Sequence, residues 1–123
     1  MPVSKKSYRI REKLSKIAAI ISEKKANDIV ILDVRNLSGL CDYFIICSGS
    51  STRHARAIYE ETVRACKKNQ IEIQHCEDDA LGEWILVDFF DVVLHIFFSQ
   101  TRPFYNLEYL WSRAKKVPLK SPH

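Results

Sequence analysis

The sequence predicts a single α/β domain in which helices flank a mixed β-sheet of about five strands. The chain has 123 residues, the length of one domain. Long segments with apolar residues at helical spacing alternate with short β-branched or aromatic runs, which are typical of strands. The predicted order is helix, two strands, helix, three strands and helix. Helices packed on a mixed sheet would bury the apolar faces of all these elements.

The first predicted helix begins near Ile10, and its apolar residues recur at helical spacing up to Ile21 with charged residues opposite. Asn27 and the residue after it end this helix. The compact apolar run Ile29–Val34 predicts the first strand. Tyr43–Cys47, after a loop, is apolar on both faces, which favours a central position in the sheet.

The second predicted helix follows a short Gly-Ser stretch and ends at Asn69. Ser50 or Ser51 can accept a hydrogen bond from the free amides of its first turn. Residues 71–74 alternate between apolar and polar side chains, which predicts a half-exposed strand. The segment 76–82 is rich in acidic residues and is predicted to be a loop.

Residues 84–114 predict a β-hairpin followed by one helix. Trp84–Val87 and Val92–Phe98 are apolar and rich in β-branched or aromatic residues, and the short turn between them makes the strands antiparallel. Pro103 fits a first helical turn. We expect one apolar stripe of this helix to pack across the sheet; it consists of Phe104, Leu107, Leu110, Trp111 and Ala114. The predicted domain covers residues 1–116, and the patternless segment 117–123 is predicted to be a disordered tail.

Charge is distributed unevenly along the chain. The formal net charge of +4 is too small to indicate a nucleic-acid binder by itself. No Lys or Arg occurs between Asn69 and Thr101, where seven acidic residues lie, whereas the first 25 residues hold eight Lys or Arg and two Glu. An acidic surface attracts basic proteins and repels phosphate. The alternative is a solvated loop in which these charges cluster by chance.

The cysteines and the hydropathy pattern indicate in which cellular compartment the protein is expected. The four cysteines form no C-x-x-C pair, which favours free thiols in a reducing compartment. No segment approaches the length of a membrane span, so we expect no membrane partner. The basic, amphipathic N-terminus resembles a mitochondrial presequence, but its apolar pattern continues into the domain. We therefore expect a cytoplasmic protein.

The stretch Ser48–Ser51 before a helix could hold a phosphate on free backbone amides, as in the Gly-Ser turn of nucleotidyltransferases. That chemistry requires two carboxylates that share a divalent metal and one strand face. Asp88 and Asp91 are three residues apart across a turn. Asp78 and Asp79 are adjacent in a loop. Neither pair has the required spacing, so a tight turn with a helix cap is the favoured interpretation.

The histidines do not indicate a catalytic or metal site. A lone histidine in a strand, such as His95, is more often a packed, hydrogen-bonded core residue than a base. His75 has no partner pair at zinc spacing. Arg53 and His54 open the second helix, where the dipole disfavours cations, which indicates either an external contact or a link to a carboxylate such as Asp42. We expect no catalytic residue, metal or cofactor.

Two blocks of the sequence resemble the ribosomal silencing factor (Iojap) family. The first is Asp42–Gly49, with Ser51, Arg53 and His54 after it. The second consists of Trp84, Val87, Asp88, Asp91, Val92 and His95–Phe97, then Arg102, Tyr105, Leu107, Glu108, Leu110 and Trp111. The resemblance covers roughly residues 10–116. It implies an architecture similar to the nucleotidyltransferase fold, and a binding factor rather than an enzyme.

The resemblance also implies a partner and a mechanism. In this family the hairpin region docks on large-subunit ribosomal protein fourteen, a small, basic, β-rich protein, and the bound factor blocks association with the small subunit and represses translation. The contact candidates by position are Trp84, Leu86, Asp88 and Asp91, with Tyr105 and Glu108 as weaker ones. A Trp at a strand rim is either part of the core or an interface anchor.

One position departs from the family pattern. A glycine commonly precedes the second turn aspartate in this family, and Phe90 stands there in this chain. A large apolar side chain in a tight turn either changes the turn geometry or adds exposed apolar area to the docking surface.

Three alternatives concern the class of function and the partners. A nucleotidyltransferase-like enzyme would bind nucleotide and magnesium near Ser48–Ser51. A factor for assembly of the large subunit would contact ribosomal RNA through the basic ends of the chain. The free protein could also form a homodimer, which the sequence does not decide.

Overall fold

The computed structural model describes residues 9–37, 39, 41–78 and 81–118. Ten elements follow one another along this part of the chain. They are α1 (Ile10–Glu23), β1 (Asn27–Asp33), β2 (Tyr43–Gly49), α2 (Thr52–Lys68), β3 (His75–Asp78), β4 (Trp84–Asp88), β5 (Val92–Phe98), α3 (Arg102–Tyr105), α4 (Leu107–Leu110) and β6 (Lys115–Val117).

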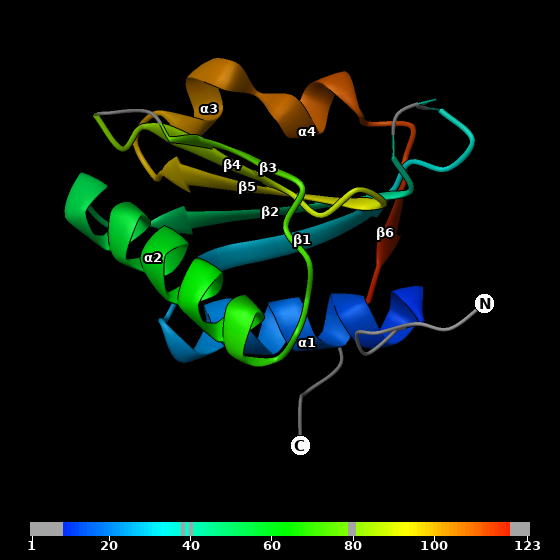
Figure 1. Cartoon of the computed structure of the whole chain (residues 1–123). Helices are drawn as coiled ribbons and strands as arrows, with labels where there is room; N and C mark the ends of the chain where they lie inside the picture. The colour runs from blue at the N-terminus through cyan, green and yellow to red at the C-terminus, as the bar shows by residue number, and fades with distance from the viewer. Residues whose placement is uncertain (1–8, 38, 40, 79–80, 119–123) are drawn as a thin grey trace.

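The strands form one mixed sheet in the order β3-β4-β5-β2-β1-β6. Only the β2–β5 pair is parallel among the described strands, and all other neighbours are antiparallel. Helices α1 and α2 lie on one face of the sheet, and α3 and α4 lie on the other (Figure 1). The α/β prediction is confirmed, with six strands instead of about five. The central position predicted for Tyr43–Cys47 is also confirmed, because β2 lies between β5 and β1.

Two apolar cores flank the sheet. The first joins α1 and α2 to the sheet and includes Ile17, Ile58 and Val87. The second lies under α3 and α4 and includes Phe97 and Leu107. Because strand side chains alternate between faces, β4 sends Ile85 and Val87 to the first core and Trp84, Leu86 and Asp88 to the second face.

The predicted position of the third strand was wrong. Residues 71–74 have no regular structure, and β3 lies at His75–Asp78, where an acidic loop was expected. Ile71 is buried because its amide donates to the carbonyl of Cys66 and the side chain joins the first core. Strand β3 is at the edge of the sheet, where charged side chains remain in water, so the hydropathy pattern does not reveal it.

The prediction of one long last helix was also wrong. Asn106 adopts a left-handed conformation with φ 47° and separates α3 from α4. This break changes the phase of the apolar pattern. Leu107 is buried as expected, whereas Phe104 is 86% exposed and Leu110 is 71% exposed.

Strand β6 corrects the predicted start of the tail. Val117 belongs to this strand and pairs with Ile31 of β1, so ordered structure extends beyond residue 116. Strand β6 was not predicted, because three residues with two lysines carry no alternating pattern. Residues 119–123 of the predicted tail lie outside the described residues.

Candidate docking face

Part of the second face of the sheet is left open beside α3 and α4. Strand β4 presents Trp84, Leu86 and Asp88 there, all half-buried. On β3, Glu77 pairs with Leu86 and His75 pairs with Asp88, and both are exposed. Cross-strand partners lie on the same side of a sheet. We call these five residues the β3–β4 face; its carboxylates have no Lys or Arg among them.

Trp84 is held from several sides. Its ring stacks on Phe97 at a centroid distance of 5.1 Å and contacts the Tyr105 ring of α3 at 4.6 Å. Its Nε1–H donates to Nδ1 of His95 at 3.1 Å. Trp84 is therefore a partly buried member of the second core.

His95 is a buried, neutral histidine. It is 5% exposed, and its ring lies edge-on against Phe44. Burial lowers its pKa to about 4. Because Nδ1 accepts from Trp84, the proton of the neutral ring is on Nε2, which is buried and has no hydrogen-bond partner in the described part of the chain. The expectation of a packed, hydrogen-bonded core residue is confirmed.

The hairpin turn retains a closed geometry despite Phe90. A carboxylate oxygen of Asp88 accepts the Phe90 amide at 2.7 Å, and the Phe89 amide donates to the Val92 carbonyl at 2.8 Å. Phe90 adopts φ 88°, a backbone region that favours glycine, and is 71% exposed. Asp88 therefore shapes the turn as well as charging the face.

Asp91 lies apart from the β3–β4 face. Its carboxylate forms an ion pair of 2.7 Å with Lys13 Nζ, which also donates to the Phe89 carbonyl at 3.1 Å. Lys13 belongs to α1, on the opposite side of the sheet. The structure thus brings Trp84 and Asp88 onto one face but ties Asp91 to the helix layer.

Tyr105 contacts the β3–β4 face through the Trp84 ring, whereas Glu108 has a structural partner. Arg102 donates from Nε and one terminal nitrogen to the two Glu108 oxygens, both at 3.0 Å. Its other terminal nitrogen donates to Ser48 Oγ of β2 at 2.7 Å. Arg102 is 8% exposed and joins α4 to the sheet. Sequence reasoning missed this role; an arginine beside a proline in an apolar stretch is its only signal.

The Gly-Ser stretch serves the fold. A side chain at Gly49 would place its Cβ 2.5 Å from the Ala55 amide nitrogen, so the close approach of α2 requires glycine. Ser51 Oγ accepts the His54 amide at 2.9 Å and caps α2. His54 Nδ1 accepts the Ser50 amide, so its Nε2–H donates to the Lys24 carbonyl at 2.8 Å. These contacts support the interpretation as a turn with a cap.

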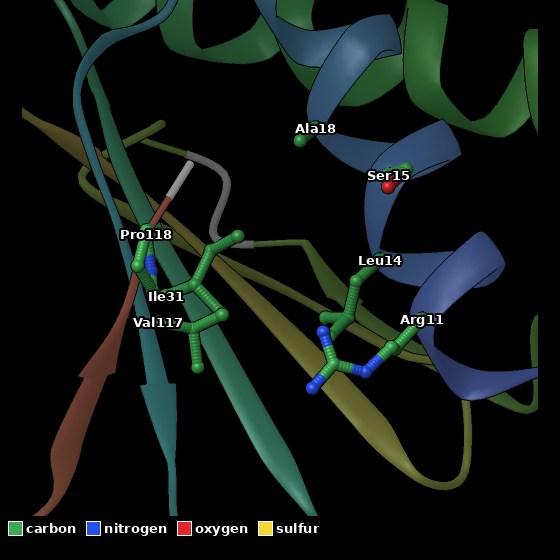
Figure 2. Close-up of a pocket in the computed structure, with 7 residues that line it drawn as sticks. All are labelled: Arg11, Leu14, Ser15, Ala18, Ile31, Val117 and Pro118. Atoms are coloured by element: carbon green, nitrogen blue, oxygen red, sulfur yellow. The ribbon is translucent and has the colours of Figure 1, made fainter. Parts of the chain in front are cut away.

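The remaining features concern cavities, metal ions and membranes. A cavity of about 150 Å³ lies between α1 and the β1–β6 edge, and Figure 2 shows Arg11 as its one charged lining residue. Other hollows of the described surface are larger, at about 400 to 600 Å³, and one of them is the groove between α1 and α2. The described residues contain no group of three or more His, Cys, Asp or Glu that could hold a metal ion. In the same part of the chain, no helix is long and apolar enough to cross a membrane.

Comparisons with known proteins agree with the sequence resemblance. The family model "Ribosomal silencing factor during starvation" matches residues 7–123. The ribosomal silencing factor RsfS of Bacillus subtilis is 40% identical over 102 residues, which cover 83% of this chain and 86% of that protein. A crystal structure from Bacillus halodurans has a TM-score of 0.78 and 35% identity, covering 89% of this chain and 99% of that chain. The mouse protein named mitochondrial assembly of ribosomal large subunit protein 1 is 31% identical over 78% of this chain and 43% of its own length.

Proposed function

Because this chain belongs to the ribosomal silencing factor family, we propose that it binds the large ribosomal subunit and prevents the small subunit from joining. Its direct partner is ribosomal protein fourteen of the large subunit, docked on the β3–β4 face. Such a block needs an interface of about 1,600 Å² and a bulky domain in the path of the small subunit. Binding alone then represses translation.

The observation that carries this proposal is an aromatic anchor within an acidic, partly open sheet face. Trp84 is held by Phe97, His95 and Tyr105, so little side-chain freedom remains to be lost on binding. Tryptophan is a frequent energetic centre of protein interfaces. The carboxylates of Asp88 and Glu77 lie on the same face and complement a basic partner.

We adjust the set of proposed contacts to the geometry of the face. Trp84, Leu86 and Asp88 form the centre, and Glu77 and His75 extend it along β3. Tyr105 lies at the rim against the Trp84 ring. Glu108 is a secondary candidate because Arg102 already binds both of its oxygens. Asp91 is left out of the proposed contact because Lys13 holds it toward α1.

The proposed mechanism contains no catalytic step. The relatives are named as silencing or assembly factors. The Gly-Ser stretch that suggested a nucleotidyltransferase-like enzyme is used for capping and close packing. We retain the cytoplasm as the proposed compartment, because all four cysteines are free thiols.

A subunit-joining assay tests the proposal. Purified large and small subunits are mixed with the chain, joining is followed by light scattering, and bound protein is located on sucrose gradients. The wild-type chain should sediment with the large subunit and reduce joining, and Asp88→Lys should lose most of both effects. Glu60→Lys is the control, because Glu60 is exposed on α2, on the opposite side of the sheet. Full inhibition by Asp88→Lys would contradict the assigned face.

A second candidate function is assembly of the large subunit, favoured by the name of the mouse relative. It predicts incomplete large subunits in cells that lack the chain during rapid growth. Silencing predicts complete subunits in those cells and a failure to reduce translation when nutrients are scarce. Gradient profiles and the protein composition of the large subunit under both conditions distinguish the two functions.

A further inference from the structure

The two helices on the first face of the sheet carry the opposite charge from the β3–β4 face. Residues 10–25 and 52–68 hold ten Lys or Arg and four Glu, a formal net charge of +6. This exceeds the net charge of the whole chain, which is +4. The positive charge is therefore concentrated on the layer formed by α1 and α2, below the sheet in Figure 1.

The two helices run antiparallel with a groove between them. The end of α1 meets the start of α2 at the hydrogen bond between the Lys24 carbonyl and His54. The charged residues that line the groove are Lys16, Arg64 and Lys68 together with Glu23 and Glu61. On α2, Arg53, Arg64 and Lys68 recur at helical spacing and share one exposed side. We call Lys24, Lys25, Arg53, Arg64, Lys67 and Lys68 the cationic helix face.

Several cations of this face form no close ion pair within the described residues, although Lys24 and Lys68 lie near enough to Glu61 to interact with its charge. Arg64 pairs with Glu61 at 2.6 Å. No such ion pair joins Lys24, Lys25 or Arg53 to any carboxylate in the described segments, and all three are exposed. Their charges remain available to an external anion.

The helix dipole accounts for only some of these positions. Lys67 and Lys68 lie in the last turn of α2, where the negative helix end favours cations. Arg53 lies in the first turn of α2, where the dipole disfavours a cation. The neighbouring His54 accepts the Ser50 amide and donates to the Lys24 carbonyl, so its ring is used within the fold. Arg53 thus lacks an explanation within the fold.

We propose that the cationic helix face is a second binding surface, which contacts the phosphate backbone of RNA. The inference rests on the proposed function only for the source of that RNA, because a factor on the large subunit is surrounded by ribosomal RNA. It moves the expected RNA contact from the basic chain ends to a folded surface. The acidic β3–β4 face repels phosphate, so the two faces select different partners.

The size of the surface fits several phosphates. Arg53 and Lys68 are 15 positions apart on α2, which corresponds to about 22 Å of helix. In duplex DNA one strand carries a phosphate about every 3.4 Å of helix axis, so this length matches several phosphates of a nucleic-acid duplex. Lysine and arginine on a helix surface bind phosphate without reading sequence, so we expect little preference for one RNA sequence.

Fluorescence anisotropy with a labelled RNA duplex of about 16 base pairs tests the inference. The helix variant carries Lys24→Glu, Lys25→Glu and Arg53→Glu. It should bind the duplex at least about tenfold more weakly at low salt, and its slope of log affinity against log salt should fall by about 2 to 3. The control carries Arg113→Glu, Lys115→Glu and Lys116→Glu, an equal charge change on exposed residues near β6, and should retain the wild-type slope.

Two further arms separate this inference from the proposed function. The helix variant should keep wild-type affinity for isolated ribosomal protein fourteen, and Asp88→Lys should keep wild-type affinity for the duplex. Equal RNA binding by the helix variant and the wild-type chain would overturn the inference. Binding of the wild-type chain to vesicles of anionic lipid but not to RNA would overturn it as well. Melting temperatures of both variants establish that they are folded.

Discussion

Trp84 and His95 form a hydrogen-bonded pair in which burial keeps the histidine neutral. The indole N–H donates a hydrogen bond to Nδ1 of His95, and the rest of the imidazole lies among aromatic rings. A charged imidazolium would lose water and would also lose its ability to accept from the indole. The β3–β4 face therefore depends on a histidine that stays neutral.

This pair predicts how stability depends on pH. The His95 pKa is about 4 in the folded chain, below the ordinary value of 6.5. At about pH 5 the unfolded chain binds a proton at this site and the folded chain does not. The stability that the neutral His95 contributes is therefore present near pH 7 and is lost as pH falls. Urea unfolding should show a loss of about 2 kcal/mol from this group between about pH 7 and pH 5.

The control for this prediction is His95→Gln, which removes the titrating ring and retains a hydrogen-bond acceptor for Trp84. Between about pH 7 and pH 5, its unfolding free energy should fall by about 2 kcal/mol less than that of the wild-type chain. Identical pH dependence in the two proteins would show that His95 is not the responsible group.

The conformation of Phe90 predicts a difference in stability between two substitutions at this position. Its φ of 88° is strained for any residue with a side chain, and its ring is mostly in water. Phe90→Gly should therefore be more stable in urea unfolding than Phe90→Ala, by about 1 kcal/mol, because only glycine adopts this conformation without strain. Equal stability of the two variants would mean that the turn can rearrange.

The arrangement of the proposed contact residues was partly predictable from sequence. The alternation of β4 places Trp84, Leu86 and Asp88 on one face without any further information. Asp91 was grouped with them by its position in the family motif and because it is acidic. Its partner Lys13 lies 78 positions earlier, and no local pattern indicates such a contact. The buried tie between Arg102 and Ser48 spans 54 positions and was missed for the same reason.

At the scale of elements, α3 and α4 are short helices that depend on a side-chain tie. Each has four residues, too few to be stable as an isolated helix. Leu107 supplies an apolar contact with the second core, and Arg102 joins both helices to β2 through Glu108 and Ser48. This tie keeps Tyr105 against the Trp84 ring.

Breaking the tie should loosen this layer. Arg102→Leu leaves the buried Ser48 hydroxyl and Glu108 without their partner, and should lower the unfolding free energy by about 2 to 3 kcal/mol. The half-exposed Glu108 keeps the loss below that of a fully buried pair. Near-ultraviolet circular dichroism should show weaker packing of Trp84.

The matched variant is Glu108→Gln, which keeps one oxygen acceptor for Arg102 and leaves Ser48 untouched. It should lower the unfolding free energy by less than about 1 kcal/mol. If both variants had the same stability, the contact between Arg102 and Ser48 would contribute nothing.

Element types followed from periodicity where one face is buried over many residues, as in α1, α2, β2 and the β4–β5 hairpin. Periodicity failed where neighbours decide the conformation. Strand β3 is defined by pairing with β4, and β6 by pairing with β1. Asn106 divides the last helix because asparagine tolerates the left-handed region, a property shared by many asparagines that do not end helices.

At the scale of the molecule, the sheet separates two surfaces of opposite charge. The β3–β4 face and the hairpin carry carboxylates, and the α1–α2 layer carries the excess of lysine and arginine. The net charge of +4 conceals this division, because most of the opposing charges cancel in the sum. A factor of this form can approach a basic protein on one side while its other side attracts phosphate.

The most direct test of the account is the affinity for isolated ribosomal protein fourteen, measured by titration calorimetry and stopped-flow mixing at low and high salt. Asp88→Asn removes the charge of the β3–β4 face and keeps an oxygen that can accept the Phe90 amide. Asp88→Lys reverses the charge, and Glu60→Lys makes the same change on the other side of the sheet.

We expect Asp88→Asn to weaken binding moderately and Asp88→Lys to weaken it by about tenfold or more, mainly through slower association that depends less on salt. Glu60→Lys should bind like the wild-type chain. Equal affinity and equal association rates for all four proteins would contradict the proposal that the β3–β4 face docks a basic partner.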